Sequence, residues 1–140
     1  MLPETSPFHA GEAMVQARLG VREHMEGIGR RILREFMPDQ HRALFEELPM
    51  LLVGTLDAAN RPWASLVTGL PGFVRSPDAR TLTIAAGLPS GDPAASSLVP
   101  GAPIGILGIQ LETRRRNRAN GRITDVGDQA ISVHVDQSFG

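Results

Sequence analysis

The spacing of hydrophobic residues changes near Pro49. Between residues 9 and 37, apolar residues recur every three or four positions, which is the pattern of one face of an amphipathic helix. We expect this helix to break near Gly20, because glycine weakens a helix interior. The segment PDQHRALFEELP begins with Pro38 and ends at Pro49, and it predicts a second, shorter helix.

After Pro49 the pattern is that of short strands separated by Gly, Pro, Asn and Asp. The segment GFVRSPDAR (72–80) is predicted to be a loop or a bulged continuation, and 93–98 has room for one or two helical turns. Six strands after a helical lead indicate a small antiparallel barrel. The predicted strands are 50–57, 62–69, 81–86, 103–111, 114–124 and 129–136.

These elements predict one domain over residues 1–140. It would comprise an irregular lead (1–9), a helical lead (10–48) and a barrel (50–136). A chain of 140 residues is long enough for a hydrophobic core of its own.

Composition narrows the possible chemistry. The chain has no cysteine, which excludes disulfides, thiolate metal sites and cysteine nucleophiles. It has no lysine either, so Schiff-base chemistry is excluded. No apolar run reaches the roughly 20 residues of a membrane span, and the N-terminus lacks the pattern of a secretory signal. We therefore expect a cytoplasmic protein without a membrane partner.

The densest charge lies in TRRRNRANGRIT (113–124). Alternate side chains of a strand share a face, and like charges on one face repel unless an anion or carboxylates lie there. Guanidinium groups bind phosphate in bidentate fashion; the alternative is a solvated face beside Glu112 and Asp125. The net charge of -1 speaks against a nucleic-acid partner. The side chains expected on this face are Arg114, Arg116, Arg118, Asn120 and Arg122.

Other candidate groups carry weaker signals. Trp63, the single tryptophan, precedes two small residues over which a flat ligand could approach the backbone; alternatively it caps the barrel core. The segment GLPSGDPAASS (87–97) could present amides and hydroxyls to a phosphate. The four histidines have no metal-ligand spacing, so we predict no metal site, and no residue stands out as catalytic.

Several segments together resemble the pyridoxamine 5'-phosphate oxidase-like, FMN-binding split-barrel superfamily. The resemblance covers about residues 8 to 140 and is closest to the subgroup known as flavin-nucleotide-binding or oxidase-related proteins. Its carriers are PDQHRALFEELPMLLVGTLDAANRPWASLVTG, GFVRSPDARTLTI, PGAPIGILGIQLETRRRNRANGR and DQSFG.

The resemblance implies a six-stranded antiparallel split β-barrel with N-terminal helices that forms a homodimer, with FMN in a groove between the subunits. PWASLVTG would border the isoalloxazine ring and the ribityl chain, and TLTIAA would lie near the phosphate. Arg116 and Arg118 would face the flavin, and Asn120 would bond the polar edge of the ring. The other implied cofactor-binding residues are Trp63, Ala64, Ser65, Val67, Ile84, Ala85, Ser96 and Ser97.

The sequence departs from the vitamin B6 oxidases at the phosphate. Those enzymes grip it with an Arg-Lys pair after the third strand, where this chain reads SGDPAASSL (90–98). Phosphate binding would then fall to the arginine strand, to Ser96 and Ser97, or to loop amides.

Two function classes follow. The first is an FMN-dependent oxidoreductase acting on a small-molecule substrate. The second is a non-catalytic ligand-binding or sensing barrel for haem or a deazaflavin, with His134 or His24 as the candidate iron ligand.

Overall fold

The computed structural model describes residues 5–140, and the chain forms two compact units. The first extends to Arg34 and the second runs from Glu35 to Gly140. Residues 5–9 precede the first helix, as expected of the predicted lead, and residues 1–4 of that lead lie outside the described residues. The grouping of 1–140 into a single domain stays a prediction.

The first unit contains two helices, α1 (Ala10–Arg18) and α2 (Arg22–Ile32). The predicted break is confirmed at Gly20, whose φ of 69° is a left-handed conformation that glycine adopts without a steric penalty. The start of α1 is closed by a capping box between His9 and Glu12.

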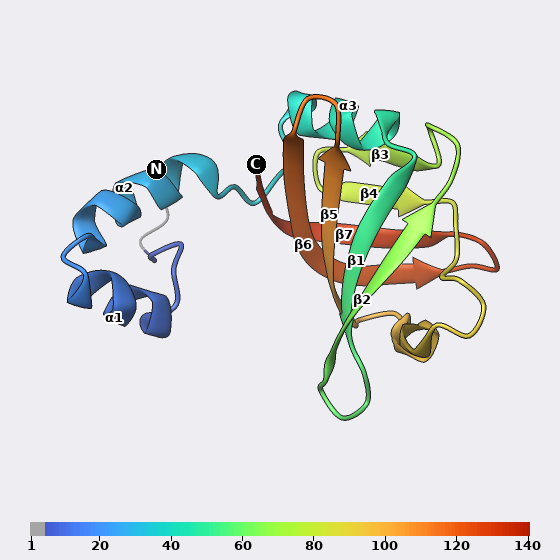
Figure 1. The fold of residues 1–140 in the computed structure, drawn as a ribbon, viewed down its shortest axis with the longest axis horizontal. Helices are drawn as coiled ribbons and strands as arrows, with labels where there is room; N and C mark the ends of the chain where they lie inside the picture. Colours follow the sequence, from blue (N-terminus) through green and yellow to red (C-terminus); the bar gives the residue numbers. More distant parts are fainter. Residues whose placement is uncertain (1–4) are drawn as a thin grey trace. The chain divides into compact units, whose positions relative to one another are not determined.

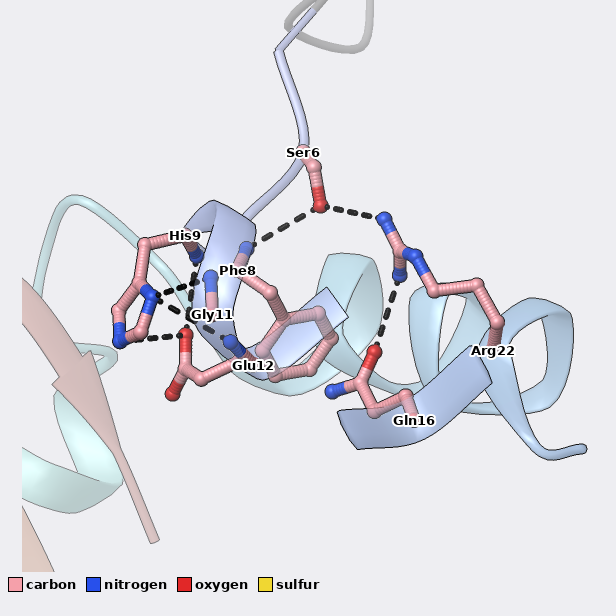
Figure 2. A network of polar contacts seen from close by, with 7 residues as sticks. All are labelled: Ser6, Phe8, His9, Gly11, Glu12, Gln16 and Arg22. Atoms are coloured by element: carbon pink, nitrogen blue, oxygen red, sulfur yellow. Dashed lines mark hydrogen bonds and ion pairs between the residues drawn. The ribbon is translucent and has the colours of Figure 1, made fainter. Parts of the chain in front are cut away.

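A polar network ties these helices to the segment before them (Figure 2). Ser6 accepts a hydrogen bond from Arg22 at 3.0 Å, as Figure 2 shows. Ser6 also donates a hydrogen bond to Glu26 at 2.6 Å. Glu26 also forms ion pairs with Arg22 and Arg30. These contacts lower the pKa of Glu26, first through the Ser6 hydrogen bond and then through Arg22.

The second unit contains helix α3 and one antiparallel sheet in the order β2-β1-β5-β6-β7-β4-β3 (Figure 1). Helix α3 (Asp39–Glu47) is the predicted short helix, and a 3-10 helix η1 (Pro93–Ser97) occupies the predicted helical turn. The strands are β1 (Met50–Leu56), β2 (Pro62–Thr68), β3 (Val74–Asp78), β4 (Thr81–Ile84), β5 (Pro103–Gln110), β6 (Arg115–Val126) and β7 (Ile131–Phe139).

The predicted count of six strands is wrong, because the segment containing β3 forms a seventh strand at the edge of the sheet. Val74 and Ser76 are buried in alternation, as in a strand, but Pro77 and a register shift against β4 obscure the pattern. Proline is tolerated there because an edge strand lacks a neighbour for one set of its amides. The last strand also continues beyond the predicted end at residue 136, to Phe139.

The core is formed by alternate residues of the strands together with residues of α3, which packs against β3, β5 and β6. Phe45 of α3 and Leu48, just after α3, pack over Gly108 of β5. A Cβ at Gly108 would lie 2.6 Å from Leu48 Cδ1, so the close approach of helix and sheet requires glycine. Among residues 5–140, no helix is long and apolar enough to span a membrane.

Candidate functional site

Strand β6 separates its side chains into two sets, as the alternation predicted. Asn117, Ala119 and Ile123 are buried in the core, whereas Arg116 and Arg118 are exposed on the outward face. Two pockets lie along that outward face and share β6 as a wall.

The larger pocket has a volume of about 540 Å³, within the range of about 300–1,000 Å³ typical of small-molecule sites. Trp63 lines it from β2 and Asn120 from β6. Directly opposed residues of paired strands point to the same side of a sheet, and the register here sets five outward residues in a row across five strands. In spatial order these are Ala64, Gly54, Gly105, Asn120 and Gln137.

The first three residues of this row make a floor with almost no side chains, which we call the glycine floor (Ala64, Gly54 and Gly105). A Cβ at Gly54 would come no closer than 3.8 Å to other atoms, and one at Gly105 no closer than 3.4 Å. The sheet packing therefore does not require glycine at these two positions. What the glycines provide is a flat, open stretch of backbone.

Two amides close the row at its other end. Asn120 Nδ2 donates a hydrogen bond to Gln137 Oε1 at 3.2 Å. Within residues 5–140, the side-chain oxygen of Asn120 (Oδ1) and the side-chain nitrogen of Gln137 (Nε2) take part in no hydrogen bond. One hydrogen-bond acceptor (the Asn120 side-chain oxygen) and one donor (the Gln137 side-chain nitrogen) therefore lie beside the glycine floor, where they could bind a planar polar ligand.

Trp63 is held in place by a carboxylate in the β1–β2 turn. Asp57 accepts hydrogen bonds from the Arg61 amide at 2.9 Å and from Trp63 Nε1 at 3.1 Å, and it forms an ion pair with Arg61. The Arg61 backbone bond, followed by the indole bond, holds the pKa of Asp57 well below its usual range. The ionised Asp57 carboxylate therefore holds the indole at the pocket edge.

The smaller pocket has a volume of about 310 Å³ and is lined by Arg114, Arg116, Arg118, Phe139 and Gly140. Within the described part of the chain, none of the three arginines forms an ion pair or a hydrogen bond through its side chain. The guanidinium of Arg118 lies over the Phe139 ring, 5.6 Å from its centroid. The pocket is therefore positive, and no carboxylate of residues 5–140 forms an ion pair with its arginines.

The predicted cofactor-binding residues fall into three groups. Trp63 and Asn120 line the larger pocket, with Ala64 on the floor beside it, and Arg116 and Arg118 line the smaller one. Ser65, Val67 and Ile84 point into the core. Ala85 follows β4 near the opposite edge of the sheet, whereas Ser96 and Ser97 belong to η1, which packs on β1 and β2; none of the three lines either pocket. Their roles toward a cofactor stay predictions.

Several pocket residues went unnoticed in the sequence, above all Gly54, Gly105 and Gln137. The available signal was strand parity, which places both glycines on the outward face of apolar strands. Their alignment depends on the pairing register, which sequence alternation does not specify.

Histidines are absent from the linings of these two pockets. His134 is half-exposed on β7, with its Nε2 3.7 Å from Asp136 Oδ1. Within residues 5–140, no three His, Cys, Asp or Glu side chains gather as a metal-binding group.

Comparison with solved structures identifies the architecture. A candidate pyridoxamine 5'-phosphate oxidase from Lactobacillus delbrueckii matches with a TM-score of 0.59 and 11% identity, covering 76% of this chain and 96% of its own. HupZ of Group A Streptococcus, in a tagged form, matches with a TM-score of 0.55 and 16% identity, covering 73% of this chain and 91% of its own. The chain has the pyridoxamine 5'-phosphate oxidase-like split-barrel fold.

At these identities the similarity establishes the split barrel alone. A protein named F420 reductase also matches, at 9% identity over 72% of this chain and 95% of its own, but its TM-score of 0.48 is too low to support a conclusion. No protein-family model matches the sequence, and no curated protein is significantly similar to it. The function of this split barrel must therefore be inferred from its own residues.

Proposed function

We propose that this split barrel binds FMN and acts as an oxidoreductase, passing electrons or hydride through the flavin to a small-molecule substrate. The observation that carries the proposal is the row from the glycine floor to the amide pair Asn120–Gln137. A flat surface ending in one acceptor and one donor matches a flat tricyclic ring whose pyrimidine edge is polar.

The residues present fit such a ring. Gly54 and Gly105 allow it to lie against backbone, and a Cβ at either position would occupy that space. The Asn120 oxygen would accept from a ring N–H, and the Gln137 nitrogen would donate to a ring carbonyl. Trp63, oriented by Asp57, would close the apolar side of the pocket.

Charge supports an anionic cofactor. Arg116 and Arg118 stand on the same outward strand face as Asn120, and neither is neutralised within the described residues. Their positive potential favours a ligand that carries a phosphate. When bound, the flavin supplies the redox chemistry, and the protein supplies binding and orientation.

A homodimer would complete the site. Beside the glycine floor runs a second outward row, which we call the leucine row: Leu66, Leu52 and Leu107. Leu66 is 45% exposed, and Leu52 and Leu107 are half-buried. An apolar strip next to an open pocket is suited to a second copy of the chain, whose surface would cover both at once. A cytoplasmic location belongs to the same proposal.

The absorbance spectrum of the purified protein, followed by titration with FMN, tests the proposal. We expect a flavin spectrum, or saturable FMN binding that quenches flavin fluorescence. A protein that is colourless and does not bind FMN would refute it. Parallel titrations with haem and a deazaflavin test the alternative class, which no specific contact in the structure favours.

A further inference from the structure

The geometry points to a dedicated phosphate-binding site in the smaller pocket, which we call the arginine pocket (Arg114, Arg116, Arg118, Phe139 and Gly140). Its ligand is a phosphate monoester, carried either by the flavin cofactor or by a separate small molecule. The first source rests on the proposed function, whereas the second does not.

Uncompensated charge is the first reason. The Cα atoms of Arg116 and Arg118 are about 7 Å apart along the extended strand β6, and Arg114 lies in the turn just before it. Their three guanidinium groups therefore repel one another across one small cavity. Within residues 5–140 no carboxylate forms an ion pair with them, whereas five arginines elsewhere in the chain each pair with a glutamate or aspartate (Arg22, Arg30, Arg42, Arg61 and Arg80). A dianion with three acceptor oxygens would satisfy this arrangement through bidentate bonds.

The backbone of Arg114 is the second reason. Its φ of 61° lies in the left-handed region, at the last residue of the turn between β5 and β6. Glycine and asparagine are the residues that adopt this conformation readily. Bulky residues held in this conformation are found preferentially at functional sites. The Arg114 side chain lines the arginine pocket.

The wall of the pocket supplies the third reason. Phe139 lies under the Arg118 guanidinium and limits its freedom, so that this charge is held toward the cavity. The ring is half-buried, whereas the three arginines are exposed. Contact with the ring on one side leaves the edge of the Arg118 guanidinium available to an anion.

The position of the pocket explains both possible sources. Arg118 and Asn120 are successive outward residues of β6, about 7 Å apart along the strand, so the arginine pocket adjoins the larger one. A flavin over the glycine floor could place its phosphate there, and so could a second molecule bound beside the ring. Ser96 and Ser97, the other candidates for this role, line neither pocket.

Three variants and one matched control test the site. Arg114→Gly removes a guanidinium and suits the left-handed turn, so it should fold at least as well as the wild type. Arg116→Gln and Arg118→Gln remove the other two charges. Arg115→Gln is the control. It removes the same charge from the residue between Arg114 and Arg116, whose side chain does not line the pocket.

Calorimetric titration with inorganic phosphate, at matched ionic strength in chloride, is the primary measurement. The wild type and Arg115→Gln should bind phosphate, with affinity reduced by about tenfold or more in each pocket variant. Phosphate binding that is absent from the wild type, or equal in the wild type and the pocket variants, would overturn the proposal.

Titration with FMN and with riboflavin, which lacks the phosphate, separates the two sources. If the cofactor supplies the group, FMN binds more tightly than riboflavin, phosphate competes with FMN, and Arg116→Gln removes the preference. If a separate molecule supplies it, FMN and riboflavin bind equally well and phosphate binds alongside either. Phosphate binding with no binding of FMN or riboflavin would refute the proposed function and leave the arginine pocket intact.

Discussion

Two glycines of β5, only three residues apart, should respond to alanine in opposite ways. Gly105 faces outward on the glycine floor, where an added Cβ would lie 3.4 Å from Asn120 Oδ1, an ordinary contact distance. Gly108 faces the core, where the added Cβ would lie 2.6 Å from Leu48 Cδ1 and 2.9 Å from Phe45 Cε1. Carbon atoms pack best at about 3.5–4.0 Å, so only Gly108→Ala forces its neighbours, the Leu48 and Phe45 side chains, to shift.

The magnitudes follow from these distances. Gly105→Ala should leave the free energy of unfolding unchanged or raise it by up to about 1 kcal/mol, because alanine loses less backbone entropy in a strand. Gly108→Ala should lower it by about 1–3 kcal/mol through overpacking. The effect on FMN binding is the opposite. The methyl group of Gly105→Ala would lie beneath a ring bound on the glycine floor, and it should cost about 1–3 kcal/mol of binding free energy, which is about 5- to 150-fold in the Kd for FMN.

Urea unfolding followed by Trp63 fluorescence gives the free energies of unfolding. FMN titration without urea, at a temperature where both variants are folded, gives the affinities. Gly108→Ala is the matched control for binding, since its methyl group points away from the pocket. An unchanged FMN affinity in Gly105→Ala would refute the placement of the ligand on the glycine floor.

Further predictions concern the strand pairing, the tryptophan and the dimer. Gly121→Ala should destabilise the second unit by about 3 kcal/mol or more, measurable by urea unfolding, because its Cβ would overlap the His134 carbonyl oxygen across the β6–β7 pair. The pKa of Asp57 is lowered by folding, so its stabilising effect is complete above the unfolded pKa of about 4 and declines as the pH falls below it. Asp57→Asn should remove that component of the acid sensitivity in urea midpoints and change the Trp63 emission even at neutral pH; unchanged emission would contradict the anchoring. Leu66→Glu should convert a dimer into monomers by light scattering, and a wild type that is already monomeric would contradict the shared-site proposal.

Much of the fold follows from local patterns in the sequence. The glycine break at Gly20, the short helix before Pro49 and the two faces of β6 were all predictable, because each depends on neighbours in the chain. The seventh strand was not, since Pro77 and a bulge conceal an alternation that only the edge position permits.

The candidate site was predictable only in part. Arg116, Arg118 and Asn120 share a strand, so parity sufficed to place them together. The glycine floor is assembled from β2, β1 and β5, and its two glycines lie some fifty residues apart in the sequence. Its alignment with Asn120 depends on three pairing registers. The role of Arg114 required the backbone angle of a turn, which its residue type does not reveal.

The position of FMN in a crystal structure of the protein grown with the cofactor tests the central claim most directly. The account predicts the isoalloxazine ring over Gly54 and Gly105, with its pyrimidine edge bonded to Asn120 and Gln137. A ring bound elsewhere on the barrel, or a glycine floor covered by protein side chains while FMN is bound, would contradict it.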